Sequence, residues 1–315
     1  MTHLPTLAGF LAPYLVALAS FPLLVGRVAF PWVASLGACL LIAGSPWLIP
    51  AELPILRFLA SISAAMLILK VLDVSLDLRQ RRVLTWKDYV HFLSNPFTLV
   101  RRSLASERRP ASRENCLRLV GGSIGCAVAT TALIGLFRLD WSSLPFLVEH
   151  IAKVTALMLA ITTGLTATAA LWRLSGGIAR DFMDRPFLAR TPADFWRRYN
   201  RNVQQFFWQN VFSGKRSRRS PIRAMLLVFG LSALLHELVF FAAVGRVQGY
   251  QTAFFLVQGL AAALTARVKV TGRLAVLWAA GTMVFNVLTS VLFFASIHGV
   301  TPFYSRGLPA WLQGW

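Results

Sequence analysis

Long apolar segments separated by short polar ones make up most of this chain, a pattern typical of membrane-spanning helices. A helix needs roughly 20 mostly apolar residues to cross the hydrocarbon core of a bilayer. The segments that meet this requirement are 7–25, 29–49, 53–72, 119–137, 144–171, 224–244, 250–266 and 274–297. The pattern therefore predicts one all-α integral membrane domain over residues 1–315, with about eight transmembrane helices plus cytoplasmic amphipathic helices.

Composition supports this class and changes the interpretation of the charge. The chain is 56% hydrophobic and only 14% charged, whereas soluble domains carry about 25% charged residues. A net charge of +20 in a soluble protein would suggest nucleic acid. Here the basic residues lie between apolar segments, so we expect membrane lipids and no nucleic acid as partners.

The basic residues also predict which side of the membrane each loop faces. With eight spans, 27 of the 32 Lys and Arg residues fall in alternate loops on one side, and only three fall on the other. Basic loops stay on the cytoplasmic side. We therefore expect an inner-membrane protein with both termini outside and both long basic loops in the cytoplasm.

The stretch "TPADFWRRYNRNVQQFFWQNVF", which starts at Thr191, predicts an amphipathic helix at the cytoplasmic interface. Thr191 is suited to the N-cap, and Pro192 and Asp194 to the first turn. At 100° per residue, Asn200 falls in the apolar sector, where an unpaired amide would cost several kcal/mol. We expect the Asn200 side chain to point into a protein cavity. The alternative is that the segment is only an interfacial anchor.

A second anomaly is the histidine in "SALLHELVF". His236 lies about 20 Å into the predicted span, and ionisable groups at that depth are functional hypotheses by default. Ser232, one turn earlier, is placed to line the same cavity. Glu237 points about 100° away and is expected to be protonated or paired elsewhere, with Asn286 as one possible partner. The alternative role for His236 is a hydrogen bond to a neighbouring helix.

These two motifs together resemble the membrane-bound O-acyltransferase (MBOAT) family. The stretch "DRPFLARTPADFWRRYN" is most similar to its wax-synthase-like branch, and "SALLHE" follows about 35 residues later. The resemblance defines a motif-bearing core at 181–245. It implies that His236 is the general base and that Asn200 is its partner, which positions the thioester or donates to the oxyanion. The implied reaction moves an acyl group from acyl-CoA, or a similar thioester, to the hydroxyl of a lipid-like or small alcohol acceptor.

The same resemblance suggests which residues bind the substrate. Arginines facing the cytoplasm would bind the phosphates of coenzyme A, which is a co-substrate and not a resident cofactor. The residues expected to bind substrate are Trp196, Arg197, Arg198, Tyr199, Arg201 and Ser232. No histidine or carboxylate spacing suggests a metal site.

Two other functions remain open at the level of the sequence. One is acylation of an envelope saccharide or lipid sugar from the outer face. The other is proton-coupled transport, with His236 and Glu237 as a proton relay.

Overall fold

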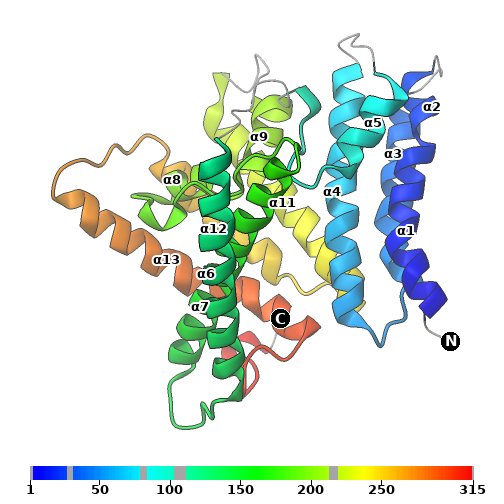
Figure 1. The fold of residues 1–315 in the computed structure, drawn as a ribbon. Helices are drawn as coiled ribbons and strands as arrows, with labels where there is room; N and C mark the ends of the chain where they lie inside the picture. Colours follow the sequence, from blue (N-terminus) through cyan, green and yellow to red (C-terminus); the bar gives the residue numbers. More distant parts are fainter. Residues whose placement is uncertain (1–2, 27–30, 79–83, 103–110, 213–218, 314–315) are drawn as a thin grey trace.

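The computed structural model describes residues 3–26, 31–78, 84–102, 111–212 and 219–313, and no strand occurs within these ranges (Figure 1). The long helices are α1 (His3–Ala19), α3 (Pro31–Gly44), α4 (Pro54–Leu78), α6 (Ser112–Arg138), α7 (Phe146–Leu174), α11 (Pro221–Val244), α12 (Tyr250–Thr265) and α13 (Leu274–Val300). The short helical segments are α2 (Phe21–Val25), η1 (Ser45–Leu48), α5 (Trp86–Ser94), η3 (Pro186–Leu188), α8 (Pro192–Arg198), α9 (Arg201–Phe207), the π-helical η4 (Trp208–Phe212) and η5 (Ala310–Leu312).

Every apolar segment found in the sequence contains a helix, which confirms the all-α membrane class. Within the described residues, six helices are long and apolar enough to cross a membrane, with α1 and α2 counted as one. The other two segments form α3, with 14 residues, and α12, with 16. At 1.5 Å per residue these are roughly 21–24 Å long, shorter than the roughly 30 Å hydrocarbon core. The number of eight spans therefore stays a prediction.

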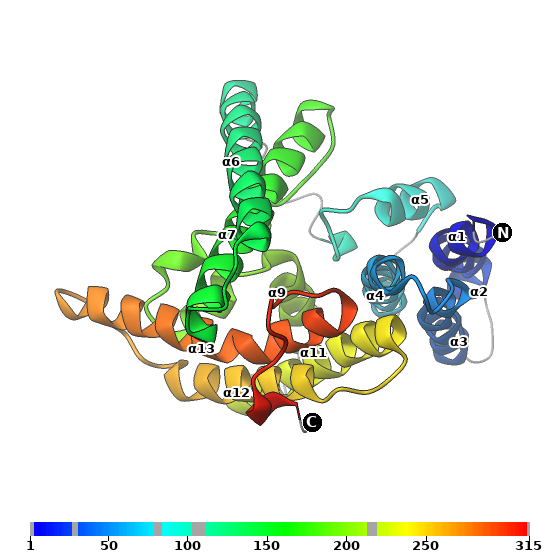
Figure 2. The same cartoon turned by 90° about the horizontal axis from the view of Figure 1, so that it is seen from below.

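The helices form two groups that α4 joins. The first group contains α1, α3 and α4, and it lies apart from α6 and α7 in both views (Figures 1 and 2). Its core includes Ala17, Ile42 and Val71, whose exposed fractions are 0%. On its other side α4 packs against α11, which in turn packs against α12 and α13. The two groups therefore meet mainly along α4, with a smaller contact between η1 and α11.

Helices α6 and α7 approach each other closely because small residues lie between them. A Cβ atom built on Gly122 would lie 2.8 Å from the backbone oxygen of Thr163 and 2.9 Å from the backbone nitrogen of Ala167. Small residues of this kind allow close backbone approach in membrane helix pairs. A side chain at position 122 would push the two helices apart.

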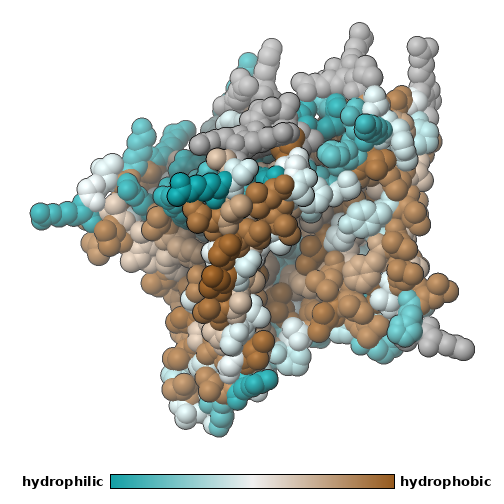
Figure 3. All heavy atoms as spheres, viewed as in Figure 1, coloured by the Kyte–Doolittle hydropathy of each residue, from teal (hydrophilic) through white to brown (hydrophobic). Residues whose placement is uncertain are grey.

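Large apolar side chains cover the middle of the molecule. Figure 3 shows an extensive hydrophobic surface there, with hydrophilic residues concentrated toward the upper end. Leu264 and Val276 are each 73% exposed, which is expected of side chains that face lipid. The start of α1 and η5 lie toward the lower end, whereas α5 and α9 lie toward the upper end (Figure 1).

Candidate active site

The motif segment folds as two short helices, so the predicted single helix through it is wrong. Helix α8 ends at Arg198, and Asn200 adopts a left-handed backbone conformation with φ of 45°. Asparagine tolerates this conformation better than most residues. Its side-chain oxygen accepts a hydrogen bond from the Val203 backbone N–H at 3.3 Å, so it caps α9. Asn200 therefore lies at a helix start and not on the apolar face of a continuous helix.

The break lets the two helices pack against different partners. In α8, Trp196 packs into an aromatic cluster with Phe229, Phe254 and Phe255 of α11 and α12. In α9, Phe206 and Phe207 pack against α4, the segment before Arg101 and two other residues of α11, Val228 and Leu235. A straight helix would direct both sets of side chains along one face, so the break is what allows the two contacts.

A polar contact with α4 fixes the far end of this segment. Asn210 of η4 donates from Nδ2 to Oδ1 of the buried Asp73 at 3.0 Å. Arg102 contacts both, with 3.3 Å to Asp73 Oδ1 and 2.5 Å to Asn210 Oδ1. The segment that carries Asn200 is therefore attached to the first helix group.

The start of α8 follows the sequence prediction. Thr191 Oγ1 accepts from the Asp194 N–H at 3.1 Å, and Pro192 occupies the first turn. Asp194 Oδ1 accepts from Arg197 at 2.7 Å and from Arg198 at 3.0 Å. Burial disfavours the Asp194 carboxylate, but these hydrogen bonds outweigh it and lower the pKa of Asp194. The side chain of Arg197 is still 71% exposed.

His236 lies in α11 with one ring nitrogen engaged. Its Nδ1 is 2.8 Å from the backbone oxygen of Ser232. A carbonyl oxygen can only accept, so Nδ1 carries the proton and Nε2 has the lone pair. Within the described residues Nε2 has no hydrogen-bond partner. The ring lies beside Phe255, with centroids 4.4 Å apart, and Phe293, at 6.1 Å.

The buried His150 and the partly buried His298 use their basic nitrogens in structural hydrogen bonds. His150 Nε2 is 3.0 Å from the backbone oxygen of Val287 and so carries the proton, while Nδ1 accepts from the Tyr304 hydroxyl at 2.7 Å. In His298, Nδ1 accepts from the backbone N–H groups of Phe303 at 3.0 Å and Tyr304 at 3.2 Å. Neither has a free lone pair on a ring nitrogen.

One expectation about the neighbours of His236 needs correction. Ser232 contacts the ring through its backbone carbonyl, and a role of its side chain in substrate binding stays a prediction. The carboxylate of Glu237 does not pair with Asn286; it accepts from the N–H groups of Gln248 at 2.8 Å, Gly249 at 2.7 Å and Thr252 at 3.2 Å. The physical reason is that these N–H groups at the start of α12 have no partner within their own helix.

A buried amide that the sequence analysis missed links α8 to α12 and α13. Gln258 is 1% exposed, and its Oε1 accepts from Trp196 Nε1 at 2.9 Å. Its Nε2 lies 2.8 Å from Thr289 Oγ1 and 3.3 Å from Asn286 Oδ1. A glutamine inside an apolar span indicates a buried polar contact. The sequence could not identify its partners, because they lie far away along the chain.

The structure brings some of the predicted site residues together. Trp196 and His236 both pack against Phe255, with ring centroids 5.8 Å and 4.4 Å from it. Tyr199 lies against Trp196, 5.6 Å between centroids, and burial raises the pKa of its hydroxyl. Arg197 and Arg198 form ion pairs with Asp194.

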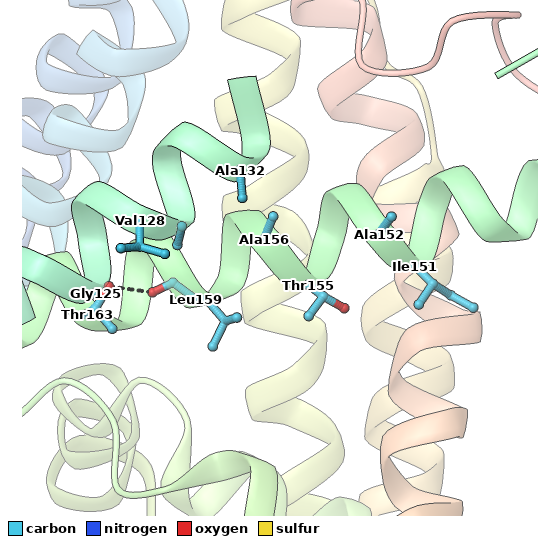
Figure 4. Close-up of a pocket in the computed structure, with 10 residues that line it drawn as sticks. Gly125, Val128, Ala132, Ile151, Ala152, Thr155, Ala156, Leu159 and Thr163 are labelled. Atoms are coloured by element: carbon cyan, nitrogen blue, oxygen red, sulfur yellow. Dashed lines mark hydrogen bonds between the residues drawn. The ribbon is translucent and has the colours of Figure 1, made fainter. Parts of the chain in front are cut away.

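A separate groove of about 670 Å³ lies between α6 and α7 (Figure 4). Its walls are small or apolar side chains such as Gly125, Ala129 and Ala156. Its lining contains no titratable side chain. It therefore lacks an acid, a base or a charged group, and it is not the candidate active site.

Comparison with known families gives one match. Residues 132–298, just over half of the chain, match the family model described as MBOAT, membrane-bound O-acyltransferase family. The match includes Asn200, His236, Gln258 and Asn286. No curated protein matches the chain significantly.

Proposed function

Because the chain belongs to the membrane-bound O-acyltransferase family, we propose that it transfers an acyl group from an acyl-CoA to the hydroxyl of a lipid-like or small alcohol, with His236 as general base. The family itself makes the protein a membrane-bound acyltransferase. The donor, the acceptor and the residue roles are our proposal. A lipid-like alcohol is the acceptor that the wax-synthase-like motif favours.

The free Nε2 of His236 is the observation that carries this proposal. A general base needs an unshared lone pair within reach of the substrate. In His236 the bond from Nδ1 to Ser232 leaves that lone pair on Nε2. In His150 and His298 a ring nitrogen accepts a structural hydrogen bond instead.

The proposed step is a direct acyl transfer. Nε2 of His236 removes the proton from the acceptor hydroxyl as its oxygen attacks the thioester carbonyl. The new C–O bond forms and the C–S bond breaks. The imidazolium then returns its proton to the leaving thiolate of coenzyme A, so the histidine is regenerated.

The motif helices supply the donor side of the site. Arg197, Arg198 and Arg201 would bind the phosphates of coenzyme A, and the high exposure of Arg197 supports this. Asn200 would position the thioester through its Nδ2, because its Oδ1 already caps α9. The aromatic wall formed by Trp196 and Tyr199 would receive the start of the acyl chain.

We also propose that the protein lies in the cell inner membrane with both termini outside. The distribution of basic residues supports this orientation. The fold agrees with this orientation. The start of α1 and η5 lie toward one end of the molecule, and α5 and α9 lie toward the opposite end (Figure 1). Under this orientation the arginines of α8 and α9 face cytoplasmic acyl-CoA.

The direct test is release of coenzyme A from a panel of acyl-CoAs of different chain length, with long-chain and short-chain alcohols as acceptors. The purified wild-type protein should release coenzyme A in an acceptor-dependent manner. His236→Ala should lower the rate by roughly 10²–10⁴-fold, as expected for loss of a general base. The variant should still insert and fold, because the change makes α11 more apolar.

His91→Ala is the matched control. His91 is exposed in α5, and its removal should leave most of the activity. Wild-type turnover by a folded His236→Ala protein would exclude the proposed base. Loss of folding in that variant would instead assign the histidine a structural role.

A further inference from the structure

The hydrogen-bond network around Gln258 fixes the direction of each amide in it. The indole N–H of Trp196 can only donate, so the atom of Gln258 that faces it is the oxygen, Oε1. The amide nitrogen of Gln258 therefore faces α13. There it donates to Thr289 Oγ1 and to Asn286 Oδ1.

The same reasoning leaves one donor of Asn286 unpaired. Its Oδ1 faces Gln258, because the opposite orientation would bring two NH₂ groups together. Its Nδ2 therefore points away from Gln258. This nitrogen is inaccessible to solvent and has no hydrogen-bond partner among the described residues. An unsatisfied buried donor costs about 1–3 kcal/mol. A substrate oxygen that reached this donor would give it the missing partner.

The unpaired donor belongs to the same region as His236. Phe255, one turn from Gln258 on α12, lies against the His236 ring at 4.4 Å. Phe293, two turns from Asn286 on α13, lies 6.1 Å from the same ring. Phe255, Phe293 and Trp196 all belong to one aromatic cluster. The amide network and the histidine therefore border a common wall.

We propose that Nδ2 of Asn286 donates a hydrogen bond to the carbonyl oxygen of the acyl thioester, as a second donor beside Asn200. This assignment rests on the acyl transfer proposed above. When the acceptor oxygen bonds to the carbonyl carbon, negative charge develops on the carbonyl oxygen. Nδ2 stabilises that charge until the C–S bond breaks and the carbonyl reforms.

The reaction does not require this donor to touch His236. The base is about 3 Å from the acceptor oxygen, which is about 3 Å from the carbonyl carbon in a reactive complex. The donor binds the carbonyl oxygen beyond that, at about 3 Å. The base and the donor therefore act on opposite sides of the reacting carbon, up to ~8–10 Å apart. His236 and Asn286, which border the same aromatic wall, suit this separation between base and donor.

Asn286→Leu tests the proposal because stability and activity should change differently. The variant removes an unpaired donor together with the Oδ1 that accepts from Gln258, and Gln258 Nε2 keeps Thr289 Oγ1 as its other acceptor, so the melting temperature should stay close to that of the wild type. Its kcat for coenzyme A release should fall by roughly 10²–10³-fold with little change in KM, as expected for a contact that strengthens in the transition state. The smaller Asn286→Ala should show the same loss of kcat without any possibility of a clash.

Thr289→Val is the matched control, because it removes the other group that accepts from Gln258 Nε2 but no unpaired donor. It should keep most of the wild-type kcat. Equal losses in Thr289→Val and Asn286→Leu, or a near wild-type kcat in Asn286→Leu and Asn286→Ala, would overturn the assignment. His236→Ala in the same assay separates the two proposals: if it is inactive while the Asn286 variants are active, only the role of Asn286 fails.

Discussion

At the scale of single residues, the hydrogen bonds of a side chain decide whether it can take part in chemistry. The chain has five histidines, and burial alone would favour His150, which is 0% exposed. Its two ring nitrogens are both engaged in structural hydrogen bonds. His236 is less buried, yet its ring keeps a free lone pair. The tautomer that each neighbour imposes is a better guide here than burial.

Asn200 has two separable roles that one substitution can distinguish. Asn200→Asp keeps an oxygen to cap α9 and tolerates the left-handed backbone, but it removes the Nδ2 donor. We expect the melting temperature to stay close to that of the wild type while kcat for coenzyme A release falls by roughly 10–10³-fold.

Gln204→Ala is the control for this prediction, since it changes a neighbouring amide of α9 on the predicted polar side. It should be nearly silent. Equal activity losses from the two variants would reduce the segment to an interfacial anchor.

At the scale of elements, α11 and α12 are held together by a side chain that caps one helix from the other. Gly249 has no side chain with which to cap α12, and the carboxylate of Glu237 accepts from the N–H groups there instead. This contact fixes the start of α12, and with it Phe255 and Gln258, relative to the helix that carries His236. Glu237 therefore supports the site without contacting His236.

Glu237→Ala should destabilise the protein by about 1–3 kcal/mol, because it leaves buried N–H groups without an acceptor. Glu237→Gln should retain much of the stability, since its amide oxygen still accepts. Thermal unfolding in detergent measures both effects.

The control is Glu114→Ala, which removes a partly exposed pair with Arg118 in α6. Pairs of this kind contribute about 0.3–0.5 kcal/mol. If Glu237→Ala is no more destabilising than Glu114→Ala, the cap does not hold the hairpin together.

At the scale of the whole molecule, the distribution of charge predicts how the protein lies in the membrane. Single cysteines at Ser94 and Ser175, in a background without Cys39, Cys116 and Cys126, should react only with a reagent supplied from the cytoplasm. A cysteine at Ser143 should react only from the outside. All three positions are exposed. Labelling of positions 143 and 175, which flank α7, from the same side would contradict the topology.

The proposed catalytic groups all lie in the second helix group. The proposed acid–base and amide groups lie at the start of α9 and on α11, α12 and α13, while α4 of the first group packs behind α9 and α11. The hydrogen bond from Asn210 to Asp73 is a polar link between the two groups. The motif segment is therefore anchored to α4 of the first group by both apolar and polar contacts.

The sequence by itself determined the features that depend on neighbours within about four residues. Apolar runs predicted the helices, and Thr191 and Pro192 predicted the start of α8. Glu149 and Lys153, four residues apart on α7, are in contact at 2.5 Å, as the spacing of a helical turn predicts. The membrane class and the position of His236 inside a span follow from the same local pattern. Each of these needs only the helical repeat and the chemistry of helix ends.

Only the tertiary structure decided which groups meet across helices. The break at Asn200, the cap that Glu237 provides and the contact of Trp196 with Gln258, 62 residues away, all depend on how helices rotate and tilt against one another. The hydrophobic periodicity gives the face that a helix buries, but neither its partner nor its register along that partner. For this reason the sequence could identify His236, whereas the unpaired Nδ2 of Asn286 emerges only from the packed structure.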